Sequence, residues 1–261
     1  MKLYVLDLGK IVMMTENPVT EEDGGEEASA IPVSAFLIDS PKGKLLFDTG
    51  CHPDAMKGAW PKEMCTNPYI CDEESTLLSR LKQINVKPEE IKYIVVSHLH
   101  LDHAGGLHFF PNAEVYVQEN ELIRTMDDYK NGESDIFHME CDIKNWEKAG
   151  INWKTVNSEE SVEICSGVSI IDLKSGHSFG MLALRVELGH GTFLLVSDAA
   201  YCAYHYGPPS RLSGAIYDEI GYFKSIETIR DMEEKYDAKV IFGHDMDQFK
   251  ELIKSQNGFY E

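Results

Sequence analysis

The segment Val95-Val96-Ser97-His98-Leu99-His100-Leu101-Asp102-His103-Ala104-Gly105-Gly106 decides the fold. An apolar strand ends at Val96, and four side chains able to bind a metal follow within six residues. If strand alternation persists this far, His98 and His100 point to one side, and the turn directs Asp102 and His103 to a second position. Imidazole nitrogen and carboxylate oxygen suit Zn²⁺ and its neighbours among the divalent metals. The segment therefore predicts a metal centre.

Four ligands cannot close two metal sites, so the rest of the chain should supply more histidine or aspartate at strand ends. Three further positions fit this expectation. His177 follows the apolar run that ends at Leu173, Asp198 ends the run that begins at Thr192, and His244 follows Ile241-Phe242-Gly243. A single histidine at a strand end is most often structural, so these three residues depend on the fold to bring them to the histidine cluster.

Short apolar runs bounded by turn residues predict β-strands along the whole chain. Residues 31–38 and 44–47 flank Pro41-Lys42-Gly43 and predict a hairpin. Helical periodicity occurs around Leu77–Ile84 and Ile226–Tyr236, with Ser225 as the expected N-cap of the second helix. Because most strands read as hairpins, we expect sheets packed on each other with helices outside, rather than a parallel doubly wound sheet. Residues 1–261 are expected to form one domain.

Composition narrows the classes of partner. The 261 residues contain 24 Lys+Arg and 44 Asp+Glu, a formal net charge of −20. Such a chain repels phosphate backbones and anionic lipid, so neither nucleic acid nor a membrane is an expected partner. The N-terminal segment reads as a strand and not as a signal peptide, so a cytoplasmic protein acting on a small molecule is expected. The sequence leaves monomer and homodimer open.

The pattern His-x-His-x-Asp-His, with later Gly-His, Asp and Gly-His at strand ends, resembles the metallo-β-lactamase superfamily. Leu46-Phe47-Asp48-Thr49-Gly50 is similar to that superfamily's early Asp-Thr-Gly. Ser197-Asp198-Ala199-Ala200-Tyr201 and Phe242-Gly243-His244-Asp245 look like segments of one subgroup, the quorum-quenching N-acyl-homoserine lactonases. Where that subgroup often has Pro and a second His after Gly-His, this chain has Phe179 and Met181.

The resemblance implies an α/β fold, a four-layer αββα sandwich with a dinuclear metal site at the sheet edge. It implies two divalent metal ions, with Zn²⁺ favoured and Mn, Fe or Co compatible. A first set, His98, His100 and His177, would bind one metal. A second set, Asp102, His103 and His244, would bind the other. Asp198 would bridge both metals, and Asp48 would orient a ligand by hydrogen bonding.

The implied activity is metal-dependent opening of a lactone ester ring, with N-acyl-homoserine lactones as the expected substrates and a metal-bridging hydroxide as the attacking group. Tyr201 is expected to donate a hydrogen bond to the reacting oxygen, and Asp102 to carry a proton to the leaving oxygen. Apolar residues of the first loop and beyond, such as Met13, Met14 and Trp60, are candidates for acyl-chain contacts. The acidic run Glu21–Glu27 reads as a solvated loop or a lip over the site.

Two alternatives stay open at this stage. One is a thioester or phosphodiester hydrolase of the same superfamily, although no cluster of Lys or Arg near the motifs would anchor an anionic substrate. The other is a non-catalytic metal-binding protein. Two observations count against it. Seven apparent ligands for two ions leave coordination positions for water, and no cysteine falls at a ligand position, although structural zinc sites favour cysteine ligands.

Overall fold

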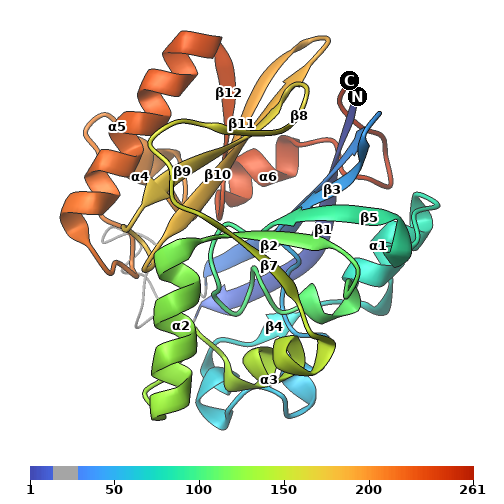
Figure 1. Ribbon diagram of the computed structural model, residues 1–261, viewed down its shortest axis with the longest axis vertical. Helices are drawn as coiled ribbons and strands as arrows, with labels where there is room; N and C mark the ends of the chain where they lie inside the picture. The colour runs from blue at the N-terminus through green and yellow to red at the C-terminus, as the bar shows by residue number, and fades with distance from the viewer. Residues whose placement is uncertain (14–28) are drawn as a thin grey trace.

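Two β-sheets packed face to face carry the fold in the computed structural model, which describes residues 1–13 and 29–261 (Figure 1). The seven-stranded sheet contains, in spatial order, β4 (Tyr69–Ile70), β1 (Lys2–Met13), β2 (Ser29–Ser40), β3 (Gly43–Phe47), β5 (Ile91–Val95), β6 (Glu114–Gln118) and β7 (Asn152–Val156). The five-stranded sheet contains, in spatial order, β12 (Ala238–Phe242), β11 (Gly191–Ser197), β10 (Met181–Leu188), β9 (Val168–Lys174) and β8 (Val162–Cys165).

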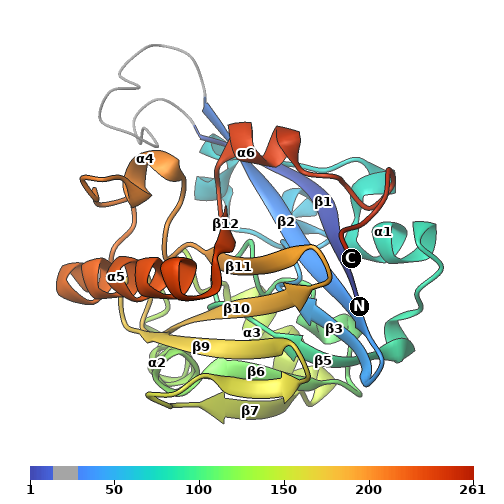
Figure 2. The same cartoon turned by 90° about the horizontal axis from the view of Figure 1, so that it is seen from above.

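Helices cover the outer faces of both sheets. The α-helices are α1 (Leu77–Gln83), α2 (Glu119–Asn131), α3 (Glu140–Ala149), α4 (Ala203–Tyr206), α5 (Glu219–Tyr236) and α6 (Met246–Glu251). Short 3-10 turns are η1 (Ala55–Lys57), η2 (Lys62–Thr66), η3 (Glu73–Ser75), η4 (Pro88–Glu90) and η5 (Leu107–Phe109). Figure 2 shows α5 along the outer side of the five-stranded sheet.

Three buried apolar clusters separate four layers. Alternation along β1 sends Leu3 and Val5 into the cluster between the sheets, and Leu6 and Leu8 into the cluster under the helices of the seven-stranded sheet. The third cluster joins the five-stranded sheet to α5, in which Ile226 is fully buried. The predicted αββα sandwich is therefore confirmed, with one apolar layer between each pair of neighbouring layers.

The expected hairpins are present, because β2 and β3 pair antiparallel and so do the successive strands from β8 to β11. The remaining neighbours among β3, β5, β6 and β7 pair in parallel, as do β11 and β12. One local expectation was wrong: α5 begins at Glu219 with Asp218 as its N-cap, accepting from the Gly221 amide at 3.0 Å. Ser225 lies inside this helix, where its hydroxyl donates to the carbonyls of Leu173 and Gly221. Its buried tertiary contact explains why a serine occurs there.

The sandwich brings distant parts of the chain to one edge. The loops after β5, β9, β11 and β12 hold the metal-binding types of side chain that the sequence singles out. An inter-sheet hydrogen bond from the Leu182 amide to the Ser97 carbonyl, 2.8 Å long, ties the two sheets beside these loops. None of the helices among the described residues has the length and apolarity needed to span a membrane.

Candidate metal centre

The fold brings all seven predicted ligand side chains into one buried cluster. The cluster members are His98, His100, Asp102, His103, His177, Asp198 and His244, each at most 8% exposed. Four come from the loop after β5, and the other three come from the loops after β9, β11 and β12. Two sheets therefore build the centre jointly.

The first set consists of His98, His100 and His177. One ring nitrogen from each lies within 4.8 Å of the others. Within this set, His100 Nδ1 and His177 Nε2 are 3.0 Å apart. Three imidazoles therefore direct a nitrogen towards one point.

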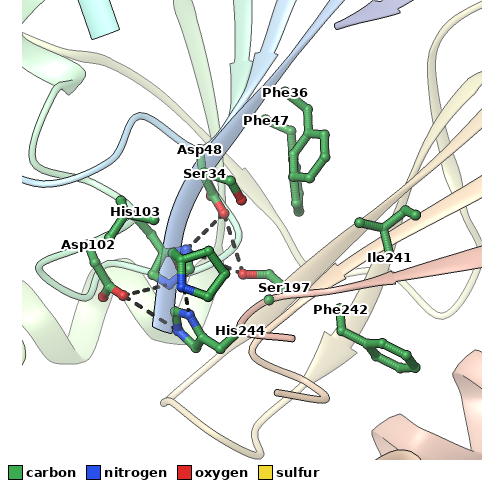
Figure 3. Close-up of a pocket in the computed structure, with 13 residues that line it drawn as sticks. Ser34, Phe36, Phe47, Asp48, Asp102, His103, Ser197, Ile241, Phe242 and His244 are labelled. Carbon is green, nitrogen blue, oxygen red and sulfur yellow. Dashed lines mark hydrogen bonds and ion pairs between the residues drawn. The ribbon is translucent and has the colours of Figure 1, made fainter. Parts of the chain in front are cut away.

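The second set consists of Asp102, His103 and His244 (Figure 3). Asp102 Oδ2 lies 3.5 Å from His103 Nε2 and 3.5 Å from His244 Nε2. The turn after the histidine pair therefore directs Asp102 and His103 to a second position, as the sequence predicts.

Asp198 lies between the two sets. Its Oδ1 is 3.4 Å from His103 Nε2, and its Oδ2 is 3.0 Å from His244 Nε2 and 3.4 Å from His177 Nε2. Gly243 makes room for this carboxylate, because a side chain there would begin 2.4 Å from Asp198 Oδ1. One carboxylate thus faces both sets, which is the arrangement a bridging ligand requires.

Four of the histidines are oriented by a hydrogen bond at Nδ1, the ring nitrogen that faces away from the centre. The Nδ1 partners are Ser97 Oγ for His98 (3.0 Å), Asp48 Oδ2 for His103 (2.9 Å), the Ala215 carbonyl for His177 (2.6 Å) and the Pro32 carbonyl for His244 (3.2 Å). When Nδ1 carries the proton, Nε2 presents a lone pair to the centre, which is how metal-binding histidines are commonly oriented.

Asp48 is the hub of these contacts. Its Oδ1 accepts from the Ser97 amide at 2.7 Å, and its Oδ2 accepts from Ser97 Oγ at 2.9 Å. The same Oδ2 faces Ser197 Oγ (Figure 3). Its backbone φ is +62°, a conformation that non-glycine residues seldom adopt. The structure thus places Asp48 where the sequence predicts an orienting group. Ser97 and Ser197, which sequence reasoning missed, stand directly before His98 and Asp198.

Without a bound metal, the histidines of the centre fall into two groups according to the direction in which their pKa is shifted. Burial, reinforced by neighbouring imidazoles, keeps the pKa of His98 and of His100 well below the usual range. For His103 and His244 burial acts in the same direction, but nearby carboxylates prevail and raise the pKa of both. Burial also opposes ionisation of Asp198, yet His244 and His103 hold the pKa of that carboxyl well below its usual range. Positive charge on His103 and His244 is thus stabilised beside Asp102 and Asp198.

The residues present fit divalent metal ions. His98 Nε2, His103 Nε2 and Asp198 Oδ1 are buried and make no hydrogen bond to any part of the protein that the structure describes. Ligands about 2.0–2.1 Å from a tetrahedral zinc lie about 3.4 Å from one another. The nitrogen and oxygen atoms quoted above are separated by 3.0–3.5 Å within and between the sets. A cation would also replace the protons that His103 and His244 otherwise hold.

A cavity of about 350 Å³ opens beside the first set. Its wall includes His100, His177, Phe137, Phe179 and Tyr217. It is large enough for a small organic molecule, and its aromatic lining is suited to an apolar one.

The Tyr201 ring stands against a histidine of each set, with its centroid 5.3 Å from that of His177 and 5.0 Å from that of His244. Burial and the charge of Asp198 raise the pKa of Tyr201 well above its ordinary value, so the phenol keeps its proton. Its position is compatible with the predicted role as a hydrogen-bond donor.

His138, which the sequence gives no reason to place at the site, packs edge-on against His100 with 4.7 Å between ring centroids. Burial would lower its pKa, but hydrogen bonds to Asp135 and Glu121 raise the pKa of His138 to about 9. No sequence pattern pointed to His138, because its contacts arise only in the folded chain.

The structure describes two of the three residues named as candidates for acyl-chain contacts, Met13 and Trp60. Trp60 is 5% exposed and packs in the cluster under the helices of the seven-stranded sheet, so it contributes to the core. Met13 packs against the same cluster. Met14 and the acidic run Glu21–Glu27 lie outside the described residues.

A second group of side chains of metal-binding types, His52, Cys141 and Asp142, shares no residue with the centre. His52 Nδ1 already accepts from the Asp54 amide at 3.0 Å, and Asn145 Nδ2 lies 2.8 Å from His52 Nε2. Both ring nitrogens are engaged, so this group does not present a histidine lone pair as the first set does.

Comparisons with known proteins agree with the fold and the centre. A model of the metallo-beta-lactamase superfamily matches residues 28–137. The chain is 40% identical to "N-acyl homoserine lactonase AiiB" of Rhizobium rhizogenes over 100% of its length and 99% of the relative's. It is 27% identical to "N-acyl homoserine lactonase AiiA" of Bacillus thuringiensis subsp. kurstaki, with 95% of each chain covered.

A solved structure of an N-acyl homoserine lactone hydrolase, with N-hexanoyl-L-homoserine bound at its catalytic metal centre, superimposes with a TM-score of 0.81. It is 25% identical to this chain, and the match covers 97% of this chain and 96% of that one. The chain therefore belongs to the metallo-beta-lactamase superfamily and, within it, to the N-acyl homoserine lactonases.

Proposed function

We propose that the protein is a metal-dependent hydrolase that opens the ester ring of N-acyl-homoserine lactones and thereby removes these signals. The observation that carries the proposal is Asp198, a carboxylate facing two histidine-containing sets at the edge of the sandwich. The full-length similarity to curated lactonases supports the choice of substrate. The described lining of the cavity beside the first set contains no Lys or Arg, and its His138 is already paired with Asp135 at 3.0 Å, which favours a neutral substrate.

The first set and Asp198 would hold one divalent ion, and the second set and Asp198 the other. The nitrogen and oxygen donor atoms suit Zn²⁺, with Mn, Fe and Co as compatible ions. Bound divalent ions lower the pKa of water towards neutrality and polarise a carbonyl oxygen.

The chain's own groups would position the substrate and deliver a proton to its leaving oxygen. The cavity lined by Phe137, Phe179 and Tyr217 would take the apolar part of the lactone. Tyr201, which keeps its proton, would donate a hydrogen bond to the reacting oxygen. Asp102 would carry a proton to the leaving oxygen, so that the ring opens to an N-acyl amino acid with a new carboxylate. The net charge of −20 favours release of that anion.

The test is hydrolysis of acyl-homoserine lactones with C4 to C12 chains by metal-replete protein, followed in a pH-stat. Chelated protein and His98→Ala serve as controls. Metal-dependent ring opening with kcat/KM of about 10⁴ M⁻¹s⁻¹ or more is expected. Two bound metals without lactone turnover would retain the metal centre and reject the substrate, and thioesters and phosphodiesters would be assayed next. A cytoplasmic location and a one-domain organisation remain predictions.

A further inference from the structure

Glu121 is a fully buried carboxylate near the start of α2. Removing such a charge from water costs several kcal/mol unless good hydrogen bonds replace the lost solvent. In the part of the chain that the structure describes, no Lys or Arg lies within ion-pair distance of it, and its ion-pair partner is His138, with Nε2 3.3 Å from Oε1. The mechanism proposed above makes no use of this residue, so its burial calls for another explanation.

The donors around Glu121 come from the two loops that carry the first set. Oε1 accepts from the Leu99 amide at 2.7 Å, and Leu99 stands between His98 and His100. Ser178, which follows His177, donates its hydroxyl to the same carboxylate at 2.8 Å from Oε2. The Gly180 amide donates to Oε2 at 2.9 Å. One carboxylate thus fastens a loop of the seven-stranded sheet to a loop of the five-stranded sheet.

The start of α2 is itself held against the His177 loop. Gln118 Oε1 caps the helix by accepting from the amides of Asn120 and Glu121 at 2.6 and 3.3 Å. Gly180 lies so close that a side chain there would begin 2.1 Å from Gln118 Oε1. The position of Glu121 relative to the His177 loop is therefore fixed by the close approach of Gly180 to the helix start as well as by its own hydrogen bonds.

The fourth partner of Glu121 reaches the first set directly. The His138 ring packs on His100 and lies parallel to Phe179, with 4.9 Å between centroids and 6° between planes. Asp135 accepts from its other nitrogen at 3.0 Å. Glu121 therefore also holds the ring that supports His100 on the side of the cavity.

We propose that Glu121 is a positioning residue that aligns His98, His100 and His177 for metal binding by clamping the two loops that carry them. The proposal rests on the metal centre of the proposed function and does not depend on the identity of the substrate. Groups that orient metal ligands in this way typically contribute 10–100-fold to metal affinity.

The test is Glu121→Gln, in which the amide has the same size but presents two donor hydrogens. Either the Leu99 or the Gly180 amide then meets a donor instead of an acceptor. In a zinc titration of the full chain against a chromophoric chelator, we expect one binding step to weaken about 10–100-fold and the other to stay unchanged. Glu119→Gln is the matched control, because it makes the same change on the same helix, where Glu119 contacts Asn157 near the surface.

A double-mutant cycle assigns the weakened step. In the His177→Ala background, where the first set is already broken, Glu121→Gln should have no further effect on the remaining metal. Unchanged affinity at both steps in Glu121→Gln, even with a lower melting temperature, would overturn the proposal and leave a purely structural role. If Glu121→Gln does not fold, Ser178→Ala removes one clamp contact and should weaken the same step about 3–10-fold. Since zinc binding is measured without substrate, failure of the clamp is distinct from failure of the lactonase assay.

Discussion

Replacing Asp48 by asparagine should weaken metal binding at the second set, Asp102, His103 and His244. The carboxylate accepts three hydrogen bonds of 2.7–2.9 Å, from the Ser97 amide, Ser97 Oγ and His103 Nδ1. An asparagine offers one oxygen and one NH₂ group in their place. One of these contacts must therefore be lost or reversed.

Both orientations of the amide are unfavourable. If the amide nitrogen faces His103, it donates to Nδ1 and drives the proton to Nε2, the nitrogen that faces Asp102 and Asp198. If the amide is turned, its NH₂ group meets the Ser97 amide across a contact of 2.7 Å. Loss of an orienting group of this kind typically lowers metal affinity about 10–100-fold, which equals about 1.4–2.8 kcal/mol.

The assay is competition between apo protein and a chromophoric chelator for zinc, which yields a dissociation constant for each step. Asp39→Asn is a matched control on the same β2–β3 hairpin, where Asp39 forms a surface ion pair with Lys44 at 3.5 Å. Circular dichroism establishes that each variant is folded. Equal dissociation constants in Asp48→Asn and the parent protein would refute the reasoning, as would equal weakening in the Asp39→Asn control.

Two further changes separate chemistry from stability. Tyr201→Phe removes a protonated phenol beside the centre and should lower kcat about 10²–10³-fold with metal content unchanged; parental turnover in steady-state kinetics would exclude Tyr201 from the mechanism. Burial raises the pKa of Asp142 to about 8, so the folded chain binds this proton more tightly than the unfolded chain, and folding stability falls as pH rises from about 4 to 8. Asp142→Asn removes this titration, and its stability relative to the parent should grow by about 1.4 kcal/mol per pH unit between pH 5 and 7 in denaturant unfolding; a pH-independent difference would contradict the assignment.

The features best predicted from the sequence are those encoded locally. The run from His98 to His103 places four side chains of metal-binding types after a strand. The ends of the strands that precede His177, Asp198 and His244 can be recognised from hydrophobicity alone. The division into two sets came from family resemblance, and the structure places the side chains in that arrangement. Their role as ligands stays a proposal until metal binding is measured.

Long-range contacts escaped prediction. Whether β3 pairs with β5 in parallel depends on the connection between them and not on alternation within either strand. Ser225 resembles an N-cap in sequence, but its hydroxyl serves a contact 52 residues away. Glu121 bonds to Leu99 and Gly180, which are 22 and 59 residues distant, and nothing in the local sequence marks a glutamate on a helix as buried.

The distribution of the donor atoms along the chain has a consequence for biosynthesis. The loop from His98 to His103 leaves the ribosome long before His244, which stands after β12. The second set is incomplete until β12 has paired with β11, and before then a partly made chain could hold a metal there only through Asp102, His103 and Asp198. On the proposed ligand assignment, stable metal uptake at the second set would be one of the last events in making this protein. A product that stops short of His244 would lack a complete centre even after the seven-stranded sheet had folded.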